Sequence, residues 1–116
     1  MALKKVYCML WVGDMGRASR FYKEVFGLDE AYTSPHWTEL RFGDAVVALH
    51  TRGGEVEQRH SGLGFEVDDI DATIAALTAA GGTVVAGPTE RANEGIRVAD
   101  CADPDGNRFS LSQELT

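Results

Sequence analysis

The sequence repeats one short pattern of residues after an interval of 55 positions. A valine that closes an apolar segment, an aspartate suited to capping a helix and a glycine that ends a helical pattern each occur twice, as Val12 and Val67, Asp14 and Asp69, and Gly27 and Gly82. Repeated units of this kind bury their apolar faces only when they are packed together. The repeat predicts a single α+β domain over residues 1–116, made of two similar halves at about 1–58 and 59–116.

The first half predicts a strand, a helix and then three strands. Residues 6–12 alternate between two sets of side chains, and this period of two is typical of a strand. Asp14 is suited to the N-cap, apolar residues then recur at helical spacing, and Gly27 stands where helices commonly end. We therefore expect a helix over about 15–26, followed by short strands at about 29–33, 37–42 and 45–50.

The second half follows the same order. Alternating apolar residues predict a strand over about 62–67, and Asp68–Asp69 is suited to capping a helix that stops at Gly81–Gly82. Strands are expected at about 83–86, 95–101 and 107–113, with a tight turn of sequence Asp-Pro-Asp-Gly at 103–106. The polar stretch 51–61 is interpreted as the connection between the halves, and His36 and His60 as surface residues of a turn and of this connection.

The charge and hydropathy of the sequence limit which partners the protein can bind and where in the cell we expect it. Eighteen acidic residues against eleven basic ones give a net charge of −7, without a Lys/Arg cluster, so nucleic acid is an unsuitable partner. No apolar run approaches the roughly 20 residues of a membrane-spanning helix, and the N-terminus lacks the layout of a signal peptide. We expect a cytoplasmic protein whose cysteines, Cys8 and Cys101, are buried thiols rather than a disulfide.

Two segments carry a resemblance to a known family. Residues 10–28 read LWVGDMGRASRFYKEVFGL, and residues 103–111 read DPDGNRFSL. The first resembles the opening strand and helix, and the second the closing turn and strand, of the glyoxalase/bleomycin-resistance/extradiol dioxygenase group, the vicinal oxygen chelate (VOC) superfamily. The segments Val67–Asp71 and Ala80–Gly82 fit its second half.

The resemblance implies two βαβββ modules that form curved mixed sheets around a cleft, with the helices outside. Combined with strand alternation, it assigns these residues to the helix-packed faces: Val6, Cys8, Leu10, Val12, Leu40, Phe42, Val47, Leu49, Leu63, Phe65, Val67, Ile96, Val98, Phe109 and Leu111. The opposite parity faces the cleft, and its expected ligand-binding residues are Tyr7, Met9, Trp11, Trp37, Arg41, His50, Arg108 and Ser110. Glu39, Val46, Ala48, Gly62, Gly64, Glu66, Arg97 and Ser112 share that parity. Such a wall offers apolar area and a few polar anchors, as a small-molecule site requires.

Metal-dependent relatives hold one divalent ion at four positions, which the resemblance maps onto Tyr7, Ala48, Gly62 and Ser110. Alanine and glycine have no ligating side chain, and neutral tyrosine and serine are poor ligands for the usual divalent ions. We therefore expect no metal cofactor. A displaced site that uses His50, Glu66 and Glu39 is the disfavoured alternative.

Three hypotheses about function follow. The first is a metal-free binding protein similar to the bleomycin-resistance branch, which would sequester a planar aromatic drug or natural product and so confer antibiotic resistance. The second is a glyoxalase-like lyase, isomerase or other small-metabolite enzyme, with Glu39, His50 or Glu66 as general base or with the displaced metal. The third is a domain for assembly or regulation. A homodimer is implied by the resemblance, and the sequence leaves open whether any reaction is catalysed.

Overall fold

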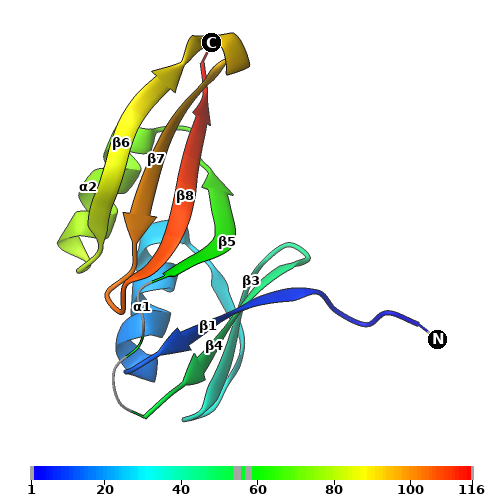
Figure 1. Ribbon diagram of the computed structural model, residues 1–116. Helices are drawn as coiled ribbons and strands as arrows, with labels where there is room; N and C mark the ends of the chain where they lie inside the picture. The colour runs from blue at the N-terminus through cyan, green and yellow to red at the C-terminus, as the bar shows by residue number, and fades with distance from the viewer. Residues whose placement is uncertain (1, 54–55, 57–58, 116) are drawn as a thin grey trace. The chain divides into compact units, whose positions relative to one another are not determined.

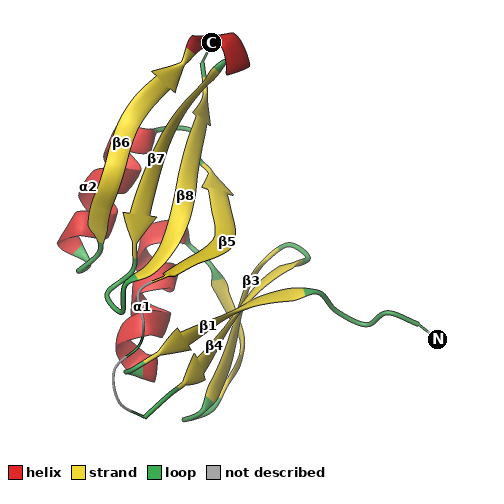
Figure 2. Ribbon diagram, viewed as in Figure 1, coloured by secondary structure: helices red, strands yellow, loops and turns green. Residues whose placement is uncertain are grey.

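The computed structural model describes residues 2–53, 56 and 59–115. The chain divides into two compact units, Met1–Val56 and Glu57–Thr116. Over the described residues each unit has a four-stranded mixed sheet and an α-helix on one face of that sheet (Figures 1 and 2). The predicted α+β fold with its repeated βαβββ order is confirmed. None of the described helices is long and apolar enough to cross a membrane.

In the first unit the elements are β1 (Tyr7–Val12), α1 (Met15–Phe26), β2 (Asp29–Thr33), β3 (Trp37–Phe42) and β4 (Ala45–Thr51). The strand order is β1-β4-β3-β2, with β1 parallel to β4 and the other neighbours antiparallel. Helix α1 contacts β3 and β4. The core beneath the helix holds Leu10, Val12, Leu40, Val47 and Leu49, which are buried.

Helix α1 begins and ends as the sequence predicts. The Asp14 side chain accepts a hydrogen bond of 3.0 Å from the Arg17 backbone N–H, which satisfies one of the unpaired donors of the first turn. Gly27 has the left-handed φ of 67°, and its N–H donates to the Lys23 carbonyl at 3.0 Å. Phe21 and Tyr22 are buried and their rings meet edge to face, so the helix is held to its sheet by large aromatic area.

In the second unit the elements are β5 (Arg59–Glu66), α2 (Ile70–Ala79), β6 (Thr83–Arg91), the short 3₁₀ helix η1 (Ala92–Glu94), β7 (Ile96–Ala102) and β8 (Asn107–Glu114). The strand order is β5-β8-β7-β6, with β5 parallel to β8, and α2 contacts β6 and β8. Asp69 caps α2 as Asp14 caps α1, accepting from the Ala72 N–H at 3.0 Å.

The turn between β7 and β8 sets the register of that hairpin. Asp103 and Asn107 are buried, and Asp103 Oδ1 accepts from the backbone N–H groups of Asp105 and Asn107 at 2.9 Å each. With this turn closed, Cys101 lies opposite Phe109 and Asp100 opposite Ser110. Paired residues lie on the same side of the sheet, so this register fixes which side each residue of β7 points to once the side of its partner in β8 is known.

Two boundaries differ from the sequence prediction. Strand β6 extends to Arg91, well beyond residue 86, and β5 begins at Arg59, inside the stretch interpreted as a connection. The pairing of β5 with β8 shifts between His60 and Gly64, so extra residues bulge from β5 there. Because a bulge interrupts the period of two, alternation in the sequence did not extend the strand this far. Positions 54–55 and 57–58 of the predicted connection lie outside the described residues.

Some residues predicted for the core are exposed at strand ends, and others lie on the opposite face of their sheet. Val6 precedes β1 and is 69% exposed, and Phe42 at the end of β3 is 72% exposed. In β7 the parity is reversed, because Val98 lies opposite Ser112 while Ala99 and Cys101 lie opposite the buried Leu111 and Phe109. Ile96 and Val98 are thus on the face away from α2. Arg97, which was expected there, instead contacts Asp71 of α2 at 3.1 Å.

Candidate functional site

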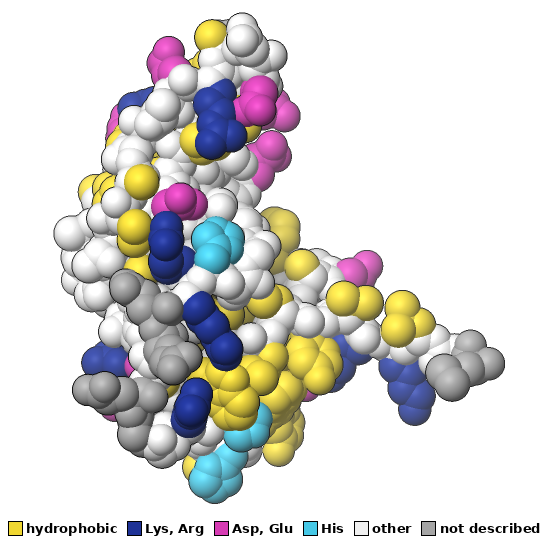
Figure 3. All heavy atoms as spheres, viewed as in Figure 1, with side chains coloured by type: hydrophobic (Ala, Val, Ile, Leu, Met, Phe, Trp, Pro, Cys, Tyr) yellow, Lys and Arg dark blue, Asp and Glu magenta, His cyan; other side chains and the backbone are white. Residues whose placement is uncertain are grey.

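A row of aromatic rings crosses the open face of the first sheet. Trp11, His50 and Trp37 occupy paired positions on β1, β4 and β3, on the face opposite α1. The Trp11 and His50 ring centroids are 4.6 Å apart, and those of Trp37 and His50 are 5.7 Å apart. All three residues are half-buried, so each ring keeps surface that a ligand can contact. Figure 3 shows hydrophobic side chains gathered over this sheet.

Tyr7 joins the row across a small residue. Its ring meets the Trp37 ring edge to face at 5.6 Å, and Tyr7 remains 50% exposed. Ala48 lies between Met9 and Glu39 in the adjacent row and is fully buried. Because alanine projects little from the sheet, the Tyr7 ring can reach Trp37 over this position. Met9 is half-buried in the same row.

Glu39 holds the edge of this aromatic surface in place. Its Oε2 accepts the Trp37 indole N–H at 2.8 Å, and its Oε1 accepts Lys5 Nζ at 2.7 Å. These hydrogen bonds, first that of Lys5 and then that of Trp37, lower the pKa of Glu39 below its ordinary value. The carboxylate therefore orients the indole, and a role as general base would require it to release these two donors.

The ring of His50 has a defined tautomer in its neutral form. Nδ1 lies 2.8 Å from the backbone carbonyl oxygen of Thr51, which can only accept a hydrogen bond. Nδ1 must therefore carry the hydrogen, and the lone pair is on Nε2. The His50 ring lies between Trp11 and Trp37, so this lone pair lies within the aromatic row. Arg41 is exposed at the outer end of this face, paired with Val46.

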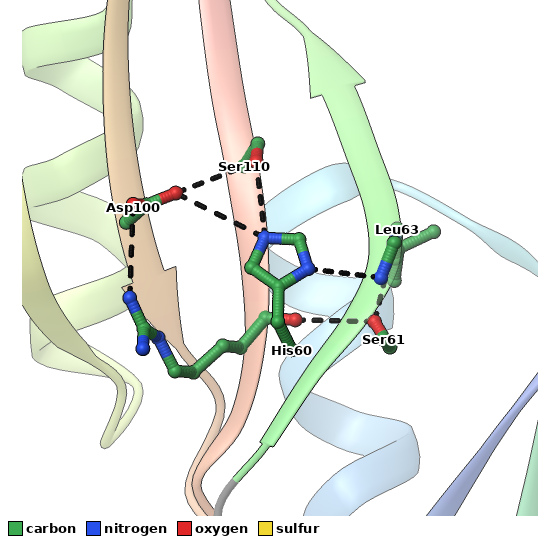
Figure 4. Close-up of polar contacts among 7 residues, drawn as sticks. His60, Ser61, Leu63, Asp100 and Ser110 are labelled. Atoms are coloured by element: carbon green, nitrogen blue, oxygen red, sulfur yellow. Dashed lines mark hydrogen bonds and ion pairs between the residues drawn. The ribbon is translucent and has the colours of Figure 1, made fainter.

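The second unit carries a chain of polar contacts across β5, β8 and β7 (Figure 4). Gly62 N–H donates to His60 Nδ1 at 2.9 Å, and His60 Nε2 lies 3.3 Å from Ser110 Oγ. Ser110 Oγ in turn donates to Asp100 Oδ1 at 3.4 Å, and an Arg108 guanidinium nitrogen lies 3.7 Å from Asp100 Oδ2. Figure 4 shows the His60 ring turned from β5 toward Ser110.

This chain contains two residues that the sequence analysis missed. His60 was interpreted as a surface residue of the connection, but it lies in β5, and the bulge that follows it turns its ring toward Ser110. Asp100 was overlooked because the apolar Ile96 and Val98 suggested the opposite facing for β7. The signal available was the tight turn at 103–106, which places residue 100 opposite Ser110 once the hairpin is closed. Glu66 is exposed at the end of β5, apart from this chain of contacts.

The positions that would hold a divalent metal do not fit one. Ala48 and Gly62 offer no donor atom, Tyr7 meets Trp37 with its ring, and Ser110 already bridges His60 and Asp100. Across the described ranges no group of three or more His, Cys, Asp or Glu side chains could hold a metal ion. For the displaced alternative, both Glu39 oxygens are engaged by Lys5 and Trp37.

Comparison with known proteins identifies the family. Residues 5–111 match the Glyoxalase/Bleomycin resistance protein/Dioxygenase superfamily, and the chain belongs to this superfamily. A "Probable lactoylglutathione lyase" of Vibrio parahaemolyticus is 33% identical over 126 residues, covering 93% of this chain and 88% of the relative. The virulence protein STM3117 of Salmonella typhimurium is 31% identical over 117 residues, covering 92% and 81%.

Solved structures show the same fold. A glyoxalase/bleomycin resistance protein/dioxygenase family enzyme from Burkholderia phytofirmans PsJN has a TM-score of 0.80 at 24% identity, covering 94% of this chain and 97% of that one. The fosfomycin resistance protein FosX from Listeria monocytogenes has a TM-score of 0.79 at 16% identity, covering 99% and 96%. At these identities the likeness concerns the fold.

Proposed function

We propose that this chain is a small-molecule binding protein that holds a planar aromatic ligand on the open face of the β1-β4-β3-β2 sheet without a divalent metal. The observation that carries the proposal is the half-exposed set of Tyr7, Trp11, His50 and Trp37 on one sheet face. Rigid rings of this kind provide large contact area with little loss of side-chain entropy. Sequestration of a drug or natural product, as in the bleomycin-resistance branch, is the corresponding biological role.

The unsuitability of the four family metal positions supports the metal-free part of the proposal. Two of them have no donor atom, and the other two present neutral hydroxyl groups, whereas a catalytic site of this type needs about three strong protein ligands. Metal analysis of the purified protein tests this directly. Stoichiometric zinc, nickel, manganese or iron would contradict it, and a metal content well below one per chain is expected.

Ligand binding is tested by a thermal-shift screen with planar antibiotics, aromatic metabolites and methylglyoxal–thiol adducts. A ligand that binds only the folded chain raises the melting temperature by mass action. For a hit, Trp37→Ala and Trp11→Ala should each weaken binding by about tenfold or more, since base or ring stacking on an aromatic residue contributes roughly 1–3 kcal/mol. Phe42→Ala is the matched control, because it removes an exposed ring at the end of β3. Unchanged binding in both tryptophan variants would refute the aromatic site.

A second candidate function is an enzyme of small metabolites with His50 as general base. The Nε2 lone pair within the aromatic row favours this reading, and one relative is named as a lactoylglutathione lyase. Incubating each thermal-shift hit with the protein and analysing it by mass spectrometry separates the two functions. Turnover that is lost in His50→Gln would favour the enzyme, whereas recovery of the unchanged ligand is expected for the binding protein.

Three further expectations belong with this proposal. The cleft implied by the family resemblance remains a prediction, as do the homodimer and the cytoplasmic location. Size-exclusion chromatography with light scattering measures the oligomeric state, and a mass of about twice 12.6 kDa is the expected result.

A further inference from the structure

The polar chain of the second unit has a direction, and that direction leads to Asp100. Because the Gly62 N–H occupies Nδ1 of His60, the neutral ring must carry its hydrogen on Nε2 and donate it to Ser110 Oγ. The Ser110 hydroxyl then has its own hydrogen to give to Asp100 Oδ1. The hydrogen bonds marked in Figure 4 therefore run in one direction, from the Gly62 N–H through His60 and Ser110 to the Asp100 carboxylate.

The carboxylate of Asp100 is only weakly satisfied by these contacts. Ser110 Oγ is 3.4 Å away, and His60 Nε2 and the nearest Arg108 nitrogen are 4.0 Å and 3.7 Å away. A charge-assisted hydrogen bond is normally about 2.7–2.9 Å long, and a carboxylate offers about four acceptor positions. The Asp100 side chain is also 39% exposed. It therefore retains both the capacity and the access to accept hydrogen bonds from a ligand.

An open pocket of about 280 Å³ adjoins this carboxylate. Its lining comes from β6, β7 and β8 and includes Asp100 together with the hydroxyl-bearing Thr89, Ser110 and Ser112, while Val98 adds apolar area. Hydroxyl oxygens and a carboxylate are the acceptors that suit a group rich in N–H donors. Arg91 is the basic residue of the lining, and its guanidinium contacts Glu94 at 3.4 Å.

The charge of the protein is concentrated in the unit that contains this pocket. Residues 57–116 include eleven acidic and four basic residues, whereas residues 1–56 include seven of each. The whole net charge of −7 therefore belongs to the second half of the chain. A net negative charge favours the approach of cations over that of anions to the unit as a whole.

We propose that Asp100, oriented by Ser110 and His60, anchors the ammonium group of a small cationic ligand in the pocket over β6, β7 and β8. Beyond the aromatic face of the first unit, the protein would then have a second binding region in the second unit, and the ligand of that region would carry a positive charge. This proposal rests on the proposed function only in that the chain binds small molecules. The alternative is that Arg108 and His60 bind an anionic group, such as a carboxylate or a phosphate, and the experiment below distinguishes the two.

The test is an NMR titration of the full chain, labelled with ¹⁵N, with three probes of similar size: benzylammonium, benzyl alcohol and benzoate. We expect benzylammonium to shift the backbone amide signals of residues 98–100 and 110–112 and to bind at least tenfold more tightly than benzyl alcohol. Benzoate should leave these signals unchanged. If benzoate bound there more tightly than benzylammonium, the site would be an anion site and the proposal would be wrong. This comparison uses the wild-type chain and depends on no variant.

Variants then assign the interaction to the named groups. Asp100→Asn keeps the shape of the side chain and should weaken benzylammonium at least tenfold, and Ser110→Ala should weaken it severalfold. Glu114→Gln removes one negative charge from an exposed end of β8 and should leave the affinity within twofold. If Glu114→Gln weakened binding as much as Asp100→Asn does, the effect would come from the net charge of the unit and not from Asp100, and the proposal would be overturned.

The two ligand sites are distinguished by crossing the variants. Trp37→Ala should leave the benzylammonium shifts in β7 and β8 intact, and Asp100→Asn should leave binding of an uncharged planar aromatic compound intact. If the wild-type chain binds uncharged planar aromatic compounds but not benzylammonium, the Asp100 site is refuted and the proposed function stands. If the thermal-shift screen of the wild-type chain gives no planar aromatic ligand, the proposed function is refuted, whatever benzylammonium does.

Discussion

The indole Nε1–H of Trp37 donates a hydrogen bond of 2.8 Å to Oε2 of Glu39, two residues further along the same face of β3. Lys5 Nζ occupies the other oxygen of this carboxylate at 2.7 Å. One side chain therefore ties the segment before β1 to an aromatic ring of the candidate site. Both hydrogen bonds need the ionised carboxylate of Glu39, because the Trp37 indole and the Lys5 ammonium group are both donors.

Acid should release this arrangement. The pKa of Glu39 is lowered in the folded chain, so its contribution to stability is fully present above the ordinary value of 4.5 and is lost as the pH falls through the lowered value. In a Trp11→Phe background, Trp37 is the remaining tryptophan. Its fluorescence should change in a titration from pH 6 downward, with a midpoint below 4.5. The same transition in a Glu39→Gln variant would show that another group is responsible.

The two apolar residues at the end of β3 should differ sharply in their effect on stability. Leu40 is fully buried and Phe42 is 72% exposed, although alternation assigned both to the core. Leu40→Ala should lower the free energy of unfolding by about 2–5 kcal/mol, because it removes buried area and leaves a cavity. Phe42→Ala should change it by no more than about 0.5 kcal/mol. Urea unfolding followed by circular dichroism measures both, and a large effect of Phe42→Ala would contradict the exposed position.

Gly87 should tolerate a side chain less well than Gly95. Both have a left-handed φ, of 87° and 68°, but a Cβ at Gly87 would lie 2.7 Å from the Val98 carbonyl oxygen, whereas a Cβ at Gly95 would meet nothing within 4 Å. Gly95→Ala should cost about 1–2 kcal/mol from backbone strain alone. Gly87→Ala adds a clash with backbone that cannot yield easily, so its loss of stability should be clearly larger. Equal losses in thermal unfolding would show that β6 and β7 separate readily at this point.

The Cys101 thiol should be unreactive in the folded chain. Burial, and then the neighbouring charge of Asp100, raises its pKa from 9.0 to about 11. The thiolate that reacts with iodoacetamide is therefore about a hundredfold scarcer at pH 8 than for an ordinary thiol. In a Cys8→Ser variant, mass spectrometry should find slow alkylation of Cys101 in buffer and rapid alkylation in urea. Rapid alkylation in buffer would mean that this part of the sheet opens easily.

Local features of the sequence predicted most of the fold correctly. Helix α1 has the predicted bounds because its signals, the Asp14 cap and Gly27, act within one turn of the helix ends. The repeat at 55 residues predicted the second capped helix and the order of the strands. The first sheet also presents Tyr7, Trp11, Trp37 and His50 on one face, because β1, β3 and β4 pair without a register shift and so keep their period of two.

Non-local contacts decided what the sequence pattern missed. A bulge in β5 brought His60 to Ser110, and the closed turn at 103–106 set Asp100 opposite Ser110. Neither outcome follows from alternation within one strand, because a register between strands depends on both partners and on the turn that joins them.

The sequence by itself determined the repeated α+β architecture, the helix ends and the absence of donor atoms at Ala48 and Gly62, because these depend on residue identity and on contacts between near neighbours. Only the tertiary structure decided that Phe42 is exposed, that the neutral His50 ring carries its lone pair on Nε2 and that a polar chain ends on Asp100. The physical reason is that burial, tautomer and hydrogen-bond direction depend on groups from different strands, which pairing brings within a few ångströms.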